Sequence, residues 1–267
     1  MNYETILCEQ KDGVATITLN RPNAKNALNT AMTDELCDAL STLRRDDSAQ
    51  VLVLTGAGAA FCSGGDARQM GSSGERSIEQ RRAAMQRYHD LTRTLYAFER
   101  PVIAAVDGVA YGAGFSLALL ADLVLVSDRV RFAMVFHRIG LVPDLGAYYT
   151  LPRAVGLQRA KELILSAREF GAAEAIQMGL ALEAVEAGAL LPRAMELATS
   201  LVGAPPLAQT LSKSALRSSL NSDLATMLDL EASAQALAGS SAYTREAIRR
   251  FGAKEPPMFR WPVAAAS

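Results

Sequence analysis

The stretch from Val102 to Asp122, VIAAVDGVAYGAGFSLALLAD, constrains the fold of this chain more strongly than any other segment. It begins as an apolar run typical of a buried strand, passes Gly108, Gly112 and Gly114, and continues as an apolar segment typical of a helix. Without Cβ atoms at this junction another molecule can approach the backbone closely, and the first N–H groups of the helix have no partner within it. The sequence therefore predicts a strand-to-helix turn whose backbone donors bind negative charge.

Strand and helix patterns alternate on both sides of this stretch, which favours a parallel or mixed sheet with crossover helices. We expect a hairpin at residues 4–20, a helix at 30–45, a strand at 51–54, a helix at 77–98, and strands at 102–106, 123–126 and 130–133. One face of the helix at 77–98 is formed by Met85, Tyr88, Leu91, Leu95 and Phe98. From residue 157 onward the pattern is helical apart from the AVEAG segment, so a helical region is expected in the last third of the chain.

A second turn of small residues, TGAGAAFCSGGD at residues 55–66, follows the strand at 51–54. Its composition predicts an irregular loop, and the polar segment from Arg68 to Gly74 beyond it is expected to be mobile. Ligands of open α/β sheets bind at the carboxyl ends of strands, where both glycine-containing turns are expected. Two such turns can direct two backbone N–H groups at one oxygen, which is the arrangement of an oxyanion hole.

Charge and cysteine content narrow the function classes. The 267 residues carry a formal net charge of −1, and the basic residues are spread along the chain, so we expect no nucleic-acid partner and no membrane partner. Cys8, Cys37 and Cys62 are odd in number and widely spaced, which favours a reducing compartment over a disulfide framework. The N-terminal segment lacks the pattern of a secretory signal, so the expected location is the cytoplasm.

Three other kinds of site fit the motifs poorly. The glycine loops lack the GxGxxG spacing of a dinucleotide site, because Phe61 stands at the third glycine position of the first loop. Ser116 lies in G-x-S-x-A, one residue short of a nucleophile elbow that would need His89 or His137 as its base, and we interpret both histidines as packed or surface residues. The chain has 2 histidines and no cysteine pair at ligand spacing, so no metal site is expected.

Four motifs, in this order, resemble the crotonase (enoyl-CoA hydratase/isomerase) superfamily over most of residues 5–190. They are NRPNAKNALN, VLTGAGAAFCSGGD, RPVIAAVDGVAYGAGFSLALLADLVL and GLVPDLGAYYTLPRAVG. The resemblance implies an α/β fold, with a crotonase-like ββα spiral core at residues 1–195 and a C-terminal helical trimerisation region at residues 196–267. It also implies an acyl-CoA thioester as substrate, coenzyme A being part of that substrate with no separate cofactor, and a homotrimer or a dimer of trimers.

The resemblance assigns binding roles to the two small-residue turns. Family members hold the thioester oxygen with two backbone N–H groups, and the matching positions here are Ser63 and Ala113. The adenine of coenzyme A is expected near positions that match two further family segments: Lys25, Asn26, Ala27, Ala60 and Asp66. At all of these positions the backbone, not the side chain, is expected to bind.

The glutamate pair of the family's hydratases is replaced in this chain. Ser116 and Phe136 occupy the two positions, and neither side chain moves a proton as a carboxylate does. Asp144 in GLVPD matches the acid/base aspartate of enoyl-CoA and dienoyl-CoA isomerases, and the motif is similar to that of the phenylacetate-pathway isomerases. An aspartate after proline also often caps the following helix, which is the alternative role for Asp144. Its pKa is expected to be raised by four apolar neighbours: Phe136, Leu141, Val142 and Leu145.

The resemblance thus implies a double-bond shift in an enoyl-CoA. Asp144 would remove a proton from the acyl chain, the Ser63 and Ala113 N–H groups would hold the resulting dienolate, and Asp144 would return the proton at another carbon. Three further side chains are candidates for the acyl pocket or, equally, for core packing: Met134, Tyr148 and Tyr149.

Three alternatives to isomerisation stay open. The first is an enoyl-CoA hydratase that acts without the usual glutamate pair. The second is an aryl-CoA enzyme similar to 4-chlorobenzoyl-CoA dehalogenase, with Asp144 as nucleophile and His89 at the position of a functional histidine. The third is a non-catalytic scaffold that binds CoA esters without turnover.

Overall fold

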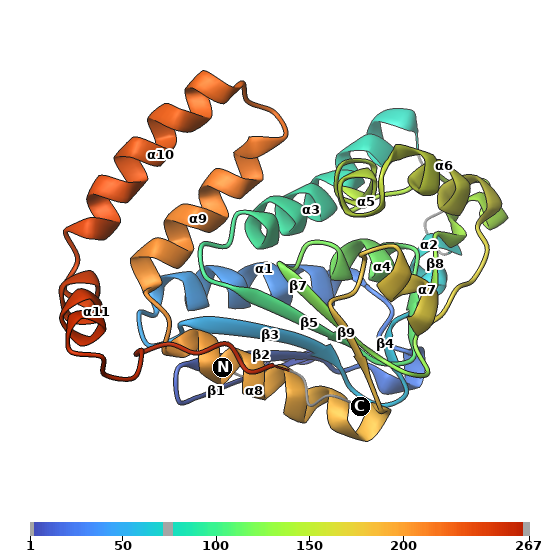
Figure 1. Ribbon diagram of the computed structural model, residues 1–267. Helices are drawn as coiled ribbons and strands as arrows, with labels where there is room; N and C mark the ends of the chain where they lie inside the picture. Colours follow the sequence, from blue (N-terminus) through green and yellow to red (C-terminus); the bar gives the residue numbers. More distant parts are fainter. Residues whose placement is uncertain (1–2, 72–76, 264–267) are drawn as a thin grey trace.

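Two sheets form the centre of the molecule in the computed structural model, which describes residues 3–71 and 77–263 (Figure 1). The larger sheet has the strand order β1-β2-β3-β5-β7-β9 and the smaller one the order β4-β6-β8. The larger sheet contains β1 (Ile6–Lys11), β2 (Val14–Leu19), β3 (Val51–Gly56), β5 (Val102–Val106), β7 (Leu123–Ser127) and β9 (Glu183–Val185). The smaller sheet contains β4 (Ala60–Cys62), β6 (Val109–Tyr111) and β8 (Arg131–Ala133). The expected α/β class is confirmed.

The chain visits the two sheets in turn, which gives the core a spiral course. β3 in the larger sheet is followed by β4 in the smaller one, β5 by β6, and β7 by β8. Within each sheet these successive strands are parallel, because helices or long connections carry the chain back between them. The hairpin expected near the N-terminus is confirmed: β1 and β2 pair antiparallel around Asp12 and Gly13, whose φ angles of 50° and 85° suit a tight hairpin turn.

Helices cover both faces of the larger sheet, so its strands are apolar on both sides. In β3, Val51 and Val53 pack toward one face, whereas Leu52 and Leu54 pack toward the other. The first face is covered by α8 (Leu190–Val202). The helices α1 (Thr30–Arg45) and α3 (Ile78–Tyr96) lie on the opposite side of the sheet in Figure 1. This double burial explains the uninterrupted run VLVL, which has no alternation of polar and apolar residues.

The remaining helices of the core follow the strand ends. Short helices precede and follow the loops near the smaller sheet: η1 (Pro22–Ala24), α2 (Ala67–Gly71), α4 (Ala113–Ala118) and η2 (Val135–Ile139). The segment before α8 forms α5 (Ala147–Val155), α6 (Leu157–Ser166), α7 (Ala172–Gln177) and η3 (Ala187–Ala189). Of the segment expected to be mobile, residues 67–71 belong to α2, and residues 72–76 lie outside the described part of the chain.

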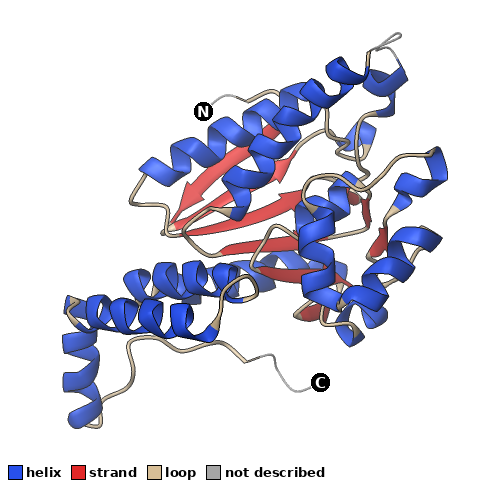
Figure 2. Cartoon of the chain, turned by 90° about the horizontal axis from the view of Figure 1, so that it is seen from above, coloured by secondary structure: helices blue, strands red, loops and turns tan. Residues whose placement is uncertain are grey.

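Three C-terminal helices extend from this core as an arm, as the orange and red ribbons of Figure 1 and the view from above in Figure 2 show. They are α9 (Pro206–Ser219), α10 (Leu224–Gly239) and α11 (Ala242–Gly252), so the expected helical region is confirmed. Lys213 of α9 anchors the arm, because its ammonium binds Asp122 at 2.5 Å and the Arg100 carbonyl at 2.8 Å. The expected boundary at residue 195 falls inside α8, and the division into two domains stays a prediction. Among the described helices, none combines the length and the apolar character needed to span a bilayer.

Two short strands were missed by the sequence patterns. The segment at 55–66, expected to be irregular, contains β4, and the expected strand-to-helix turn contains β6 before the helix begins. Each strand has 3 residues, too few for a periodic pattern, and each is held in place by pairing with a distant segment. These strands bring the two glycine-containing turns side by side.

Replacement of Gly114 by alanine tests this close approach. A Cβ at Gly114 would lie 2.7 Å from the Cys62 carbonyl carbon and closer still to its oxygen, so the two turns must separate. We expect Gly114→Ala to lower the free energy of unfolding by about 3 kcal/mol, measured by urea denaturation. Gly239→Ala at the end of α10 is the matched control, because no atom lies within 4 Å of its Cβ position. Equal stability of the two variants would contradict the proposed contact.

Candidate active site

The helix α4 starts at Ala113, in the stretch where the sequence predicted a strand-to-helix turn. Gly112 caps the helix with a φ of 51°, and the first intrahelical bond runs from the Ser116 N–H to the Gly112 carbonyl at 2.9 Å. Among the described residues, the Ala113 N–H has no hydrogen-bond acceptor, and Ala113 is buried. A ligand oxygen that reaches this turn therefore meets a donor that is already desolvated.

In the loop after β4, the free donor is Gly65 and not Ser63. The Ser63 N–H donates to the Lys25 carbonyl at 3.0 Å, so it is not available to a ligand. The Gly64 carbonyl accepts from the Leu28 N–H at 2.8 Å, and the Gly65 N–H of the same trans peptide must point the opposite way, away from Leu28. Within the described residues that N–H has no acceptor.

The Gly65 donor lies on the side of α4. A Cβ at Gly64 would lie 3.0 Å from the Tyr111 carbonyl oxygen and 3.7 Å from the Ala113 nitrogen, so this loop packs against the start of α4. The free N–H of Ala113 therefore supports its expected role as one donor. The hydrogen bond from the Ser63 N–H to the Lys25 carbonyl counts against Ser63 as the second donor. The adjacent glycines Gly64 and Gly65 in FCSGGD could have indicated this donor from the sequence. A glycine at position 65 has no side chain, which allows a ligand to approach its backbone N–H.

The five expected coenzyme A positions gather in one cluster. Asn26 is fully buried, and its side-chain amide donates to the carbonyls of Ala57 at 2.9 Å and Ala60 at 2.7 Å. The Asn26 side-chain oxygen accepts from the Arg21 N–H at 2.8 Å, so this side chain connects the turn to the loop and has no group left for a ligand. Ala27 and Ala60 are buried as well.

The charged members of this cluster differ in availability. Asp66 forms an ion pair with Arg21 at 2.7 Å, and hydrogen bonds from Arg21 and from the Arg68 N–H outweigh burial and lower the pKa of Asp66. Lys25 is exposed, with a φ of 49°. Of the five positions, Lys25 is the one whose side chain presents a charge to solvent.

Asp144 is a half-buried carboxyl group without a compensating charge among the described residues. Burial raises the pKa of Asp144 to about 7, although a hydrogen bond from its own backbone N–H acts in the opposite direction. Its Oδ1 is buried, and no hydrogen-bond partner for it exists in the described part of the chain. A carboxyl group with such a pKa is suited to take up and release a proton near neutral pH.

The helix-capping role considered for Asp144 is wrong. Gly146 is the N-cap of α5, and no side chain caps this helix. Leu145 and Gly146 both have left-handed backbone conformations, with φ angles of 48° and 76°, and Leu145 is buried. A left-handed leucine is strained, and such strain is often found where a functional side chain must be held in place.

The surroundings of Asp144 match the expectation only in part. Leu145 and Phe136 are buried, but Leu141 and Val142 are exposed and do not enclose the carboxyl group. The charge of Asp144 instead acts on two groups from other elements: after burial, it contributes to the raised pKa values of Cys62 in β4 and Tyr88 in α3, both about 12. Asp144 therefore lies within electrostatic range of β4 and of the helix α3.

The two positions of the missing glutamates lie beside this site. Ser116 is fully buried, and its hydroxyl donates to the Gly112 carbonyl at 3.1 Å, one turn earlier in the same helix. The ring of Phe136 lies 3.6 Å from the Cβ position of Gly112. Both histidines are exposed, so the serine nucleophile considered from the sequence lacks a base at Ser116.

The candidate acyl-pocket residues differ in burial and in contacts. Met134 is buried, whereas Tyr148 is exposed. The Tyr149 hydroxyl accepts a hydrogen bond from the Asn221 side chain at 2.7 Å, and the Arg153 guanidinium lies 3.4 Å from the centre of its ring. Tyr149 thus connects α5 to the loop before α10.

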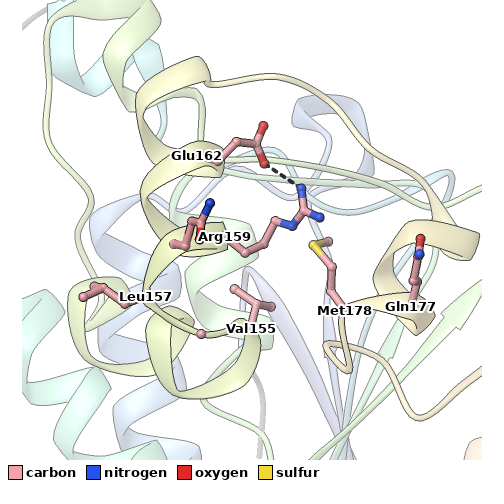
Figure 3. A pocket seen from close by; sticks show the side chains of 8 residues that line it. Val155, Leu157, Arg159, Glu162, Gln177 and Met178 are labelled. Carbon is pink, nitrogen blue, oxygen red and sulfur yellow. Dashed lines mark hydrogen bonds and ion pairs between the residues drawn. The ribbon is translucent and has the colours of Figure 1, made fainter.

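A separate cavity of about 690 Å³ lies near α5, α6 and α7 (Figure 3). Its lining is formed by Val155, Gly156, Leu157, Gln158, Arg159, Glu162, Gln177 and Met178. Arg159 and Glu162 form an ion pair at 3.3 Å there. No residue of this lining belongs to the groups around Asp144. We place the candidate active site at Asp144 because its Oδ1 is unpaired among the described residues, and because Phe136, earlier in the same segment, lies against Gly112 at the start of α4. Within the described residues, no three potential metal ligands gather.

Comparison with known proteins places these features in a family. The sequence profile of the enoyl-CoA hydratase/isomerase family matches residues 9–261. The chain is 41% identical over 259 residues to a probable enoyl-CoA hydratase of Rhodobacter capsulatus, covering 97% of this chain and 99% of the relative. It is 38% identical over 257 residues to the 1,2-epoxyphenylacetyl-CoA isomerase of Escherichia coli, covering 96% of this chain and 98% of the relative.

A solved structure gives the same result at the level of the fold. The crystal structure of an enoyl-CoA hydratase/isomerase from Cupriavidus metallidurans superimposes with a TM-score of 0.95 at 43% identity, covering 99% of this chain and 100% of the other. The matched regions extend over almost the whole length of these relatives. The chain belongs to the enoyl-CoA hydratase/isomerase family.

Proposed function

We propose that this protein is an enoyl-CoA isomerase that shifts a double bond in an acyl-CoA thioester. The N–H groups of Gly65 and Ala113 hold the thioester oxygen, on which negative charge develops when a proton leaves the acyl chain. Asp144 removes that proton as a carboxylate and, now protonated, returns it at another carbon of the dienolate. One acid/base group serves both steps, and the reaction needs no redox partner.

The observation that carries this proposal is the Asp144 carboxyl, whose Oδ1 is buried without a partner among the described residues and whose pKa is raised to about 7. Proton transfer by a side chain is most effective when its pKa lies near the working pH. The other carboxylate near this loop, Asp66, is ionised and paired with Arg21, so it does not offer a second acid/base group. Adding water to a double bond requires both activation of the water and proton delivery, which a single carboxyl group serves less well than a proton shift.

The names of the relatives support isomerase and hydratase alike. The Escherichia coli relative is named for an isomerisation of a ring-containing CoA thioester, which supports a related ring-containing or 3-enoyl-CoA substrate here. The Rhodobacter capsulatus relative is named a probable hydratase, and hydration is therefore the second candidate activity. Dehalogenation is disfavoured because His89 is exposed on α3, while the adjacent Tyr88 faces the core.

We place the coenzyme A moiety beside the turn at Lys25, Asn26 and Ala27. The Lys25 ammonium is exposed at this turn and suits the phosphates of coenzyme A. Asn26 and the Arg21–Asp66 pair support the shape of the turn through their hydrogen bonds. The coenzyme is part of the substrate, and the proposed chemistry requires no further cofactor.

We also propose a homotrimer, or a dimer of trimers, in the cytoplasm. The helix α10 has no buried side chain, although its sequence LATMLDLEASAQALAG is rich in leucine and alanine. Leu224, Leu228 and Leu237 are more than half exposed on it, which is unusual for a helix that has no partner. The three cysteines are free, as suits a reducing compartment.

Asp144→Asn is expected to remove the activity while leaving binding intact. Loss of the acid/base group should lower kcat for isomerisation of a 3-enoyl-CoA by about 10³-fold, measured spectrophotometrically, with little change in the affinity for an acyl-CoA. Asp128→Asn, at an exposed position, is the control and should keep full activity. Fast hydration of crotonyl-CoA that survives Asp144→Asn would contradict the isomerase proposal.

The same substitution should stabilise the fold above neutral pH. The folded-state pKa of Asp144, about 7, lies above the value of about 3.9 for a free aspartate, so folding favours the protonated form. Wild-type stability is therefore lost relative to Asp144→Asn as the pH rises from about 4 to about 7. We expect Tm of Asp144→Asn to exceed that of the wild type at pH 8 and the difference to shrink at pH 5, measured by thermal unfolding. A difference that is independent of pH would contradict the burial of an ionising Asp144.

Leu228→Asp tests the proposed assembly. A charge on the exposed apolar side of α10 should disrupt a helix interface and reduce the molecular mass in sedimentation velocity experiments. Leu7→Asp changes an exposed leucine on β1, outside the helical arm, and should leave the mass unchanged. A wild-type protein that sediments as a monomer would rule out the trimer.

A further inference from the structure

The carboxyl group of Asp144 lacks a hydrogen-bond donor from the rest of the fold. Its Oδ1 is buried without a partner in the described part of the chain, and the one hydrogen bond to the group comes from its own backbone. Buried polar atoms are nearly always paired, and an unpaired one often marks a functional group whose partner moves or arrives with the ligand. Two groups from other elements, Cys62 and Tyr88, are close enough to feel its charge.

Tyr88 lies on the face of α3 that packs against the Asp144 corner. Thr92, one turn later on that face, donates its hydroxyl to the Tyr88 carbonyl at 2.7 Å. The methyl group of Thr92 lies 3.0 Å from the Cβ position of Gly146, two residues after Asp144. Residues four apart lie on one side of a helix, so Tyr88 is placed one turn from this direct contact. Figure 1 shows α5, which follows this corner, beside α3.

The Tyr88 hydroxyl is a free donor, whereas the Cys62 thiol is not. Among the described residues the Tyr88 hydroxyl makes no hydrogen bond, and it is not one of the buried polar atoms that lack a partner, so it keeps some contact with solvent. The Cys62 thiol is buried and directed at the Gly64 carbonyl, with 3.9 Å between the sulfur and the oxygen. A thiol is also a weaker donor than a phenol.

Few charged groups act on the Tyr88 hydroxyl besides Asp144. Burial and the Asp144 charge keep the phenol neutral, and therefore able to donate, with a pKa of about 12. Asp66 also acts on Tyr88, but its charge is compensated by Arg21. His89, the next residue on α3, is exposed and on another face of the helix.

Building on the proposed function, we propose that Tyr88 is the positioning residue for Asp144, its hydroxyl donating to the carboxylate when the substrate displaces water from the site. A neutral donor stabilises the ionised, proton-accepting form of a carboxyl group without neutralising it. It also orients one carboxylate oxygen, which leaves the other to move the proton along the acyl chain. Tyr88 itself neither gains nor loses a proton.

Tyr88→Phe separates this role from packing, because it removes the hydroxyl and keeps the ring. The pH profile of kcat has an acid limb set by Asp144 in the substrate complex, and we expect the substitution to move that limb upward by about one pH unit. Tyr243→Phe, which removes a hydroxyl bonded to the Gly203 carbonyl at 3.1 Å in the helical arm, is the matched control and should leave the limb in place. An unchanged acid limb in Tyr88→Phe would overturn the proposal.

A direct titration of Asp144 makes the test independent of turnover. Carbon NMR of protein labelled at the aspartate carboxyl, with a non-reacting acyl-CoA bound, gives the Asp144 titration, and its signal is identified by its loss in Asp144→Asn. A higher Asp144 pKa in Tyr88→Phe supports the pairing even if no CoA thioester is turned over, in which case the proposed function fails and the inference stands. An identical Asp144 pKa in wild type and Tyr88→Phe overturns the inference, whatever activity the protein has.

Discussion

The backbone of the loop after β4 packs directly against the first turn of α4, and the geometry of the candidate site depends on this contact. Gly64 and Gly114 have no room for a Cβ without displacing the neighbouring backbone, so the two turns meet at the distance of bare peptide groups. Backbone hydrogen bonds from Leu28 and Ser63 hold the loop from its other side. The result is a pair of N–H groups on adjoining turns, at Gly65 and Ala113, that have no acceptor among the described residues.

The ionised form of Asp144 is unfavourable for the stability of the fold. The buried Asp66 has Arg21 as its cationic partner. Asp144 has no cationic partner among the described residues, and its Oδ1 has no hydrogen-bond partner there. The left-handed Leu145 adds backbone strain at the same corner. A protonated or amidated side chain would be better accommodated there than the carboxylate.

The longer elements were predictable because each repeats a pattern over several turns or a whole strand. The helix from Ile78 to Tyr96 and the strand from Val102 to Val106 agree with the expectation to within two residues. β4 and β6 were not predictable, since three-residue strands are stabilised by partners far away in the sequence. The second backbone donor was predicted at Ser63, two residues before Gly65, for a similar reason. Which peptide group stays free depends on the pairing of Leu28 and Lys25 with this loop.

The sequence by itself determined the α/β class, the helical last third and the two glycine-containing turns. Its motifs also indicated the family and identified Asp144 as the candidate acid/base residue. Only the tertiary structure decided that the Ser63 N–H is already hydrogen-bonded to the Lys25 carbonyl. It also decided that Leu141 and Val142 are exposed and that Tyr88 of α3 lies within range of the Asp144 charge. The physical reason is the range of the interactions. Periodicity and glycine content are local properties of the chain, whereas burial, free backbone donors and pKa arise from segments that the fold brings together.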